Sequence, residues 1–110
     1  ELSSAMASGY GQEECPLART LDVIGEKWSV LILRDLFRKG PLRFHDLEAG
    51  LAGVAPNTLS ARLKTLEKQG VIDTRLYEKH PPRFEYFLTG KGQALAPVLK
   101  ALYKWGELYG

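Results

Sequence analysis

The spacing of apolar residues changes at Gly70, and this change limits the possible folds of the chain more than any other property of its sequence. Before this glycine, leucines recur every three or four residues, which is the spacing of one face of an α-helix and predicts a helix over residues 57–69. After it, residues 71–77 and 84–88 are rich in β-branched and aromatic side chains and predict two strands. The polar, proline-containing segment 78–83 separates them. We therefore expect an amphipathic helix followed directly by a β-hairpin with a long tip.

Four further helices are expected from local signals. The first begins at Pro16, where a missing backbone N–H costs nothing, and the second, residues 27–39, is apolar on most sides and should be the central core helix. A short third helix begins at Arg43. A last helix follows Thr89, which can cap it, and Pro97 should kink that helix or delay its regular start. The predicted fold class is mainly α with a small β-hairpin (α+β).

Length and composition describe one domain. A chain of 110 residues with 45% hydrophobic content suits a single soluble domain, which we expect at residues 15–110. Residues 1–14 are rich in Ser, Gly and Ala and should be a flexible tail. No apolar run is long enough to cross a membrane, and the start shows no signal peptide. A single cysteine excludes an internal disulfide and fits a reducing compartment, so a cytoplasmic location is expected.

The helix over residues 57–69 has two contrasting faces. A rotation of 100° per residue gathers its three leucines on one side. The opposite side carries an amide, hydroxyls and cations without an acidic residue, and such groups bond to base edges and phosphates. The candidate DNA contacts on this helix are Asn57, Thr58, Ala61, Arg62, Lys64, Thr65 and Lys68.

The hairpin tip adds Lys79 and Arg83 as candidate contacts to an adjacent groove or to phosphates. Residues 53–110 carry nine Lys or Arg against five Asp or Glu, although the whole chain has a net charge of only +2. A basic helix surface alone, or a polar loop tip alone, does not indicate a nucleic-acid-binding protein. Their occurrence one after the other favours contact with nucleic acid.

These elements closely resemble the HxlR-type winged helix-turn-helix regulators of bacteria and archaea. The resemblance covers residues 15–109 and includes a short helix, a glycine-containing turn and a second helix before the hairpin. Its specific elements, in order, are Cys15-Pro16, Gly25-Glu26-Lys27-Trp28 and Pro81-Pro82-Arg83-Phe84-Glu85-Tyr86. Family members usually have Ser or Thr immediately before the recognition helix, where this chain has Ala55, so the start of that helix should lack a side-chain cap.

The resemblance implies a homodimer that binds an inverted-repeat operator in double-stranded DNA and represses or activates a nearby gene, with repression favoured. The recognition helix, about 56–69, would enter the major groove, and the wing, about 78–83, would meet the adjacent groove or phosphates. The alternative is a winged-helix module that binds a protein instead of specific DNA. Because acidic side chains are absent from the outer helix face, we favour DNA.

Terminal helices are the candidate dimer interface. The last helix is more apolar than a core of this size requires, and the first helix, with Leu17, Leu21 and Ile24, could supply an opposing surface. In the alternative, both helices pack only on their own domain. The predicted interface residues are Leu17, Leu21, Leu95, Leu99, Leu102, Trp105 and Tyr109.

Cys15 is a candidate redox sensor, because a helix N-terminus favours the thiolate and some relatives sense oxidants or electrophiles in this segment. The alternative is an inert residue that precedes a helix. A small-molecule effector near Trp28 and the terminal helices is also compatible with the sequence. His45 has too few companions for a metal or catalytic site. The chain lacks a phosphate loop and a nucleophile elbow, so we expect no cofactor and no enzyme activity.

Overall fold

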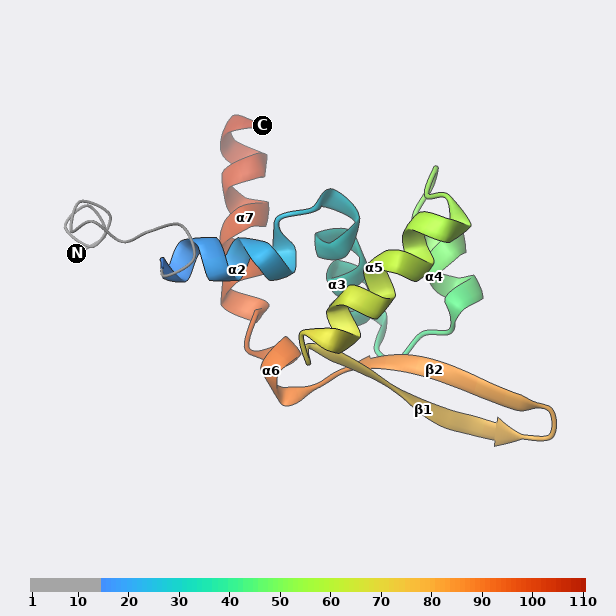
Figure 1. Ribbon diagram of the computed structural model, residues 1–110. Helices are drawn as coiled ribbons and strands as arrows, with labels where there is room; N and C mark the ends of the chain where they lie inside the picture. The colour runs from blue at the N-terminus through green and yellow to red at the C-terminus, as the bar shows by residue number, and fades with distance from the viewer. Residues whose placement is uncertain (1–14) are drawn as a thin grey trace.

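The computed structural model describes residues 15–110 and shows a helical body from which a two-stranded hairpin extends (Figure 1). The expected tail at 1–14 lies outside the described residues. The elements are α2 (Pro16–Ile24), α3 (Lys27–Lys39), α4 (Phe44–Gly50), α5 (Pro56–Lys68), β1 (Ile72–Lys79), β2 (Pro82–Leu88), α6 (Gly90–Gln93) and α7 (Ala96–Tyr109). The predicted fold class, mainly α with a small hairpin, is confirmed.

The centre of the body is α3, as predicted. Ile32, Leu33 and Leu36 on this helix are at most 2% exposed and pack with buried residues of α4, α5 and the start of β1. A helix that is apolar on most sides can be covered only from several directions. The core therefore forms around α3, and it leaves the outer face of α5 in solvent.

The helix starts follow the local signals of the sequence. Pro16 and Pro56 occupy the first turns of α2 and α5, where the missing N–H is tolerated. Before α3, the Glu26 carboxylate accepts a hydrogen bond from the Ser29 backbone N–H at 3.1 Å. Ala55 precedes α5 and provides no side-chain cap, as expected, so the proline and the core contacts of α5 define where this helix begins.

The hairpin corrects the sequence prediction. The strands reach Lys79 and start again at Pro82, so the expected six-residue loop is a tight turn at His80 and Pro81. Charged residues after Tyr77 suggested the end of a strand. In a two-stranded ribbon both faces of the distal half are in solvent, so charged residues can remain in the strands, and both strands are edges that tolerate proline.

The base of the hairpin is joined to the body. Leu42, between α3 and α4, forms an antiparallel bridge with Tyr86, and the two N–H···O distances are 3.0 and 2.7 Å. Along the hairpin the register pairs Leu76 with Phe84 and Glu78 with Arg83. Tyr77 is consequently an extra residue in β1, a β-bulge of the kind that redirects a side chain.

The expected last helix is divided in two. Thr89 caps the short α6 by accepting a hydrogen bond from the Gly92 N–H at 3.1 Å, and its hydroxyl donates to the Gly70 carbonyl at 2.6 Å. Regular helix resumes with α7, and Pro97 lies in its first turn. The predicted delay in the regular start of the last helix at Pro97 is confirmed. Its physical reason is that proline cannot provide the N–H that a continuous helix would need.

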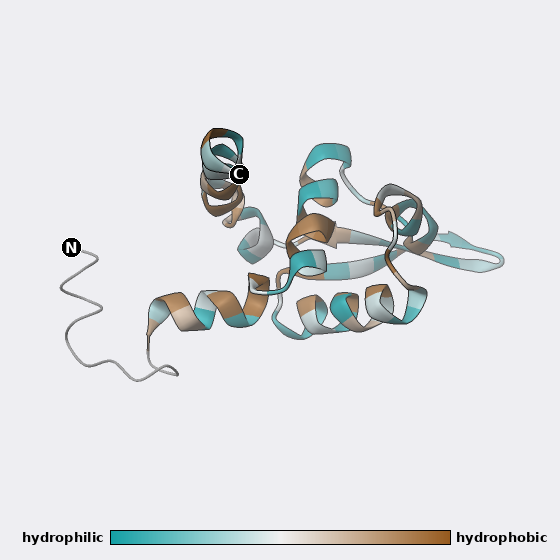
Figure 2. Cartoon of the chain, turned by 90° about the horizontal axis from the view of Figure 1, so that it is seen from above, coloured by the Kyte–Doolittle hydropathy of each residue, from teal (hydrophilic) through white to brown (hydrophobic). Residues whose placement is uncertain are grey.

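The two ends of the molecule differ in character. Helices α2 and α7 lie at the end opposite the hairpin tip in both views (Figures 1 and 2), and Figure 2 shows hydrophobic residues along them. Within residues 15–110, no helix is long and apolar enough to span a membrane.

Candidate nucleic-acid interface

The helix-turn-helix unit consists of α4, a five-residue connection and α5. Leu51 and Val54 in the connection are buried, and Gly53 has a φ of +88°, a backbone conformation that side-chain-bearing residues rarely adopt. On α5, all three predicted core leucines (Leu59, Leu63 and Leu66) are at most 1% exposed. The turn and this apolar stripe fix the direction in which the opposite face of α5 points.

That opposite face carries the candidate base and phosphate contacts. Asn57, Ala61, Lys64 and Lys68 are exposed, and Thr58, Arg62 and Thr65 are half-buried. The Thr65 hydroxyl donates to the carbonyl of Ala61 at 3.1 Å, which leaves its oxygen free to accept another hydrogen bond. The resulting surface offers an amide, hydroxyls and cations together, as direct and phosphate readout require.

The acidic residue of α5 lies away from this surface. Glu67 is half-buried on the side of Tyr86, whose pKa is raised mainly by burial and secondarily by the Glu67 charge. A carboxylate facing DNA would repel phosphates. Its position beside the hairpin base keeps the outer face of α5 cationic.

Arg62 lies between the outer face of α5 and the start of α3, a position that the sequence does not show. Its Nε lies 4.0 Å from the Glu26 carboxylate at the start of α3, and one third of the side chain is exposed. Within the described part of the chain, this Nε is buried without a hydrogen-bond partner. The guanidinium is thus held near the edge of the α5 face by a weak ion pair.

The hairpin tip places its cations in solvent. Lys79, His80 and Arg83 are exposed, and Arg83 Nε lies 3.3 Å from the Glu78 carboxylate across the ribbon. Such exposed pairs contribute little and can exchange for phosphate. Nearer the base, Arg75 pairs with Glu85 at 2.7 Å and lies over the Phe87 ring.

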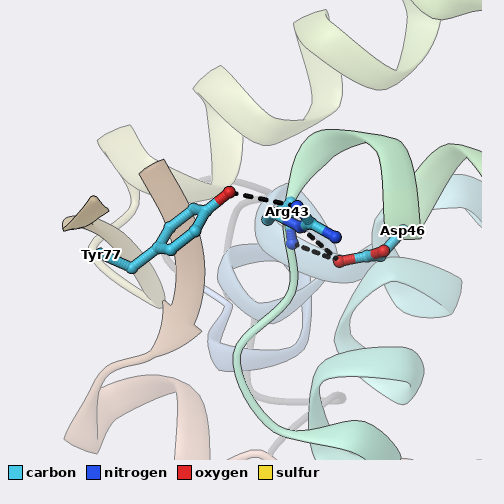
Figure 3. A network of polar contacts seen from close by, with 3 residues as sticks. All are labelled: Arg43, Asp46 and Tyr77. Carbon is cyan, nitrogen blue, oxygen red and sulfur yellow. Dashed lines mark hydrogen bonds and ion pairs between the residues drawn. The ribbon is translucent and has the colours of Figure 1, made fainter. Parts of the chain in front are cut away.

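A group of polar side chains that the sequence does not predict connects the start of α4 to the hairpin (Figure 3). Arg43 Nη1 donates to the Tyr77 hydroxyl at 3.2 Å, and the guanidinium carbon lies 5.8 Å from the centre of the Tyr77 ring. The Asp46 carboxylate accepts from the backbone N–H and Nε of Arg43, at 3.1 and 3.3 Å. The backbone N–H of Arg43 is the main reason that the pKa of Asp46 lies below its ordinary value.

The predicted dimer residues separate into exposed and half-buried groups. Leu95 and Leu99 are half-buried against the core, and Ile24, expected to face outward with Leu17 and Leu21, lies in the core at 7% exposed. We define the terminal apolar patch as the large apolar side chains of α2 and α7 that remain exposed. These are Leu17, Leu21, Leu102, Tyr103, Trp105, Leu108 and Tyr109.

Two members of this patch, Tyr103 and Leu108, are absent from the predicted interface. The spacing of three residues between Trp105 and Leu108 places Leu108 on a neighbouring part of the same helix surface, a signal that is visible in the sequence. Trp105 and Tyr109 themselves touch, with ring centres 5.5 Å apart.

A groove of about 740 Å³ lies between α3 and α7. It is lined by apolar side chains that include Leu31, Phe37 and Leu99, and by the cations Arg34, Arg38 and Lys100. Trp28, expected near an effector pocket, is half-buried against the core and is absent from the lining of this groove.

Cys15 immediately precedes α2, the position that the sequence predicts for it. Its side chain is half-buried. His45 is exposed on α4. Among residues 15–110, no group of three or more His, Cys, Asp or Glu side chains could hold a metal ion.

An amphipathic helix held by a helix-turn-helix unit and followed by a hairpin is the arrangement of a winged helix-turn-helix protein. Residues 23–110 match the family model described as HxlR-like helix-turn-helix, and the chain belongs to this family.

Known proteins agree with this assignment. The chain is 44% identical over 93 residues to the uncharacterized HTH-type transcriptional regulator sll1512 of Synechocystis, covering 84% of this chain and 68% of the relative. The solved structure of the redox regulator HypR in its oxidized form has a TM-score of 0.80 at 32% identity, covering 87% of this chain and 98% of HypR. The structure of PA1607, a candidate transcription factor, has a TM-score of 0.79 at 45% identity, with 97% and 69% covered.

Proposed function

We propose that this protein is a homodimeric, sequence-specific repressor of transcription that acts in the cytoplasm. In this proposal α5 enters the major groove of double-stranded DNA, and the hairpin tip contacts the adjacent groove or its phosphates. The two subunits bind the halves of an inverted repeat. An oxidant or a small molecule controls the affinity.

The observation that carries the proposal is the outer face of α5. It combines Asn57, Lys64 and Lys68 in solvent, has no carboxylate, and is rigidly backed by three buried leucines. An α-helix fits the major groove of B-form DNA, and amide and cationic side chains at its surface can bond to base edges and phosphates. A protein-binding surface of comparable size would have little reason to exclude carboxylates while accumulating lysines.

The terminal apolar patch supports the homodimer. Trp105, Leu108 and Tyr109 are each at least 64% exposed, and large apolar side chains gathered at one end of a chain mark an interaction surface. Helices α2 and α7, which carry the patch, lie at the end of the molecule opposite the hairpin tip (Figure 2). A second copy bound there would leave both hairpins free to reach DNA.

Two features support control by an effector. Cys15 immediately precedes α2, one of the helices that carry the patch, so its oxidation would act on the dimer. HypR, a structural neighbour, is a redox regulator. For a small molecule, the groove between α3 and α7 offers an apolar floor with Arg38 and Lys100 beside it.

The test of DNA recognition is selection from a random duplex library, followed by measurement of Kd at several salt concentrations. We expect enrichment of inverted repeats whose half-sites lie about one helical turn apart, and a log–log salt slope that reports several phosphate contacts. Lys64→Ala should weaken binding and make the slope shallower, whereas Lys39→Ala, on the exposed end of α3, should not. Enrichment of no sequence under both reducing and oxidising conditions would favour the protein-binding alternative.

The homodimer is tested separately by sedimentation. Wild-type protein should sediment as a dimer, and Trp105→Lys should shift it toward the monomer, because burying a charge in an apolar interface is costly. A wild-type chain that stays monomeric at high micromolar concentration would contradict this part of the proposal.

A further inference from the structure

We propose that Arg43 and Tyr77 form a brace that sets the angle of the hairpin to the helix-turn-helix unit, so that both are positioning residues for DNA binding. This inference rests on the proposed function, because it assigns a role in presenting the hairpin tip to DNA. It concerns residues that lie outside both the predicted recognition surface of α5 and the tip itself.

Core packing and backbone hydrogen bonds attach the hairpin to the body near its base. Ile72 is buried in the core, and Tyr86 exchanges two backbone hydrogen bonds with Leu42. Beyond this point the side chains of Leu76 and Phe84, which face each other across the ribbon, are 45% and 55% exposed. The distal half therefore leaves the body, as Figure 1 shows for the end of the ribbon.

Small rotations at the base have large effects at the tip. A strand rises about 3.3 Å per residue, so the six steps from Thr74 to His80 span about 20 Å. A tilt of about 10° over that length moves the tip by about 3.5 Å. Such a shift exceeds the tolerance of a hydrogen bond, so an unbraced hairpin would lose its phosphate contacts for much of the time.

The contact between Arg43 and Tyr77 lies where it can resist this tilt (Figure 3). The bulge in β1 makes Tyr77 the extra residue between two regular pairs. The tyrosine hydroxyl then accepts a hydrogen bond from Arg43, 34 residues earlier in the chain, and the guanidinium also lies over its ring. The brace joins the distal half of the ribbon to the first residue before α4.

Asp46 keeps the arginine in position. Its carboxylate binds both the backbone N–H and the Nε of Arg43, so the side chain leaves the start of α4 in one direction. The Arg43 side chain is 48% exposed and Tyr77 is 39% exposed. Their removal should therefore leave the core intact while releasing the hairpin.

The test compares two tyrosine-to-phenylalanine variants in the same hairpin. Tyr77→Phe keeps the ring and removes only the oxygen that accepts from Arg43. Tyr86→Phe makes the same chemical change at a residue whose contacts with Leu42 are made by its backbone. Affinity is measured by titration of the selected DNA duplex at several salt concentrations, together with thermal unfolding of each variant.

We expect Tyr77→Phe to raise Kd about three- to tenfold, the effect of one hydrogen bond, without changing the salt slope, since no phosphate contact is removed. Tyr86→Phe should change Kd by less than about twofold. An unchanged Kd for Tyr77→Phe would overturn the proposal. An Arg43→Gln variant that lowers the salt slope would also overturn it, because Arg43 would then bind phosphate directly.

A measurement without DNA separates failure of the brace from failure of the proposed function. Residual dipolar couplings of backbone amides report the orientation of residues 76–84 relative to α3. In Tyr77→Ala we expect these couplings to shrink while those of α3 stay constant, because the hairpin then samples a wider range of angles. Unchanged couplings in the hairpin would overturn the brace even if the protein binds DNA, and shrunken couplings would support it even if no DNA site is found.

Discussion

The guanidinium of Arg62 on α5 lies 4.0 Å from the carboxylate of Glu26, the residue immediately before α3. The same carboxylate accepts hydrogen bonds from the backbone N–H and hydroxyl of Ser29, at 3.1 and 3.4 Å. Glu26 thus stabilises the start of one helix and holds a cation of another. Glu26 therefore connects the start of α3 to Arg62, at the edge of the α5 surface that we propose binds DNA.

This ion pair predicts that Glu26→Gln tightens DNA binding. Glutamine can still accept from the Ser29 N–H, but it no longer competes with phosphates for Arg62 and no longer repels them. We expect Kd to fall about two- to fivefold at low salt, in keeping with a partly exposed pair. Fluorescence anisotropy with a labelled duplex measures this, with Glu48→Gln on α4 as the charge-matched control. A weaker complex would indicate that Glu26 instead orients Arg62 for binding.

The two glycines of α6 predict opposite responses to alanine. A Cβ at Gly92 would collide with the carbonyl oxygen of Val71, a backbone atom that also accepts a hydrogen bond from the Thr89 N–H. Gly92→Ala should lower the free energy of unfolding by about 3 kcal/mol. A Cβ at Gly90 meets nothing within 4 Å, and Gly90→Ala should be neutral or stabilise by up to about 1 kcal/mol. Urea titration followed by circular dichroism measures both, and equal stabilities would contradict the prediction.

The pKa of Asp46 predicts part of the acid sensitivity. The backbone N–H of Arg43, and less strongly the Arg43 side chain, hold this pKa below its ordinary value, with a small contribution in the same direction from His45. The ionised carboxylate therefore favours the folded state above about pH 4, and this contribution is lost as the pH falls through the lowered pKa. In Asp46→Asn the decline in stability below about pH 4 should be shallower. Urea midpoints at pH 7 and at pH 3 compare the two chains, and parallel pH profiles would exclude this role.

The uncapped start of α5 predicts a stabilising substitution. Ala55 has the extended backbone of a helix-capping residue, with φ −75° and ψ 141°, but no side chain that can bond to the first free N–H groups. Ala55→Ser should raise the free energy of unfolding by about 1 kcal/mol. Thermal unfolding measures the gain, and Ala55→Val, which cannot cap, is the control. A serine variant no more stable than the valine variant would show that no cap forms.

The parts of the fold that the sequence predicts are those set by interactions within a single helix. Prolines at 16 and 56 and the leucine spacing of α5 act within one helix, so the helices and the buried face of α5 appear where they are expected. The length of the hairpin does not follow from local signals, because charged residues after Tyr77 predict the end of a strand, whereas β1 continues to Lys79 and β2 begins at Pro82. Whether charged residues end a strand depends on which faces of the ribbon are in solvent, and that is a property of the whole fold.

The candidate site likewise has features that local sequence patterns predict and contacts that depend on the whole fold. The winged-helix order and the polar, carboxylate-free face of α5 can be predicted from the sequence alone, because helical periodicity and residue type act over a few neighbouring positions. The packing of the folded chain adds what the sequence does not show: Arg62 contacts Glu26, Arg43 contacts Tyr77, and Ile24 is buried while Leu17 and Leu21 are exposed. These contacts join segments far apart in the chain, and their existence depends on packing angles between helices and hairpin that no local pattern encodes.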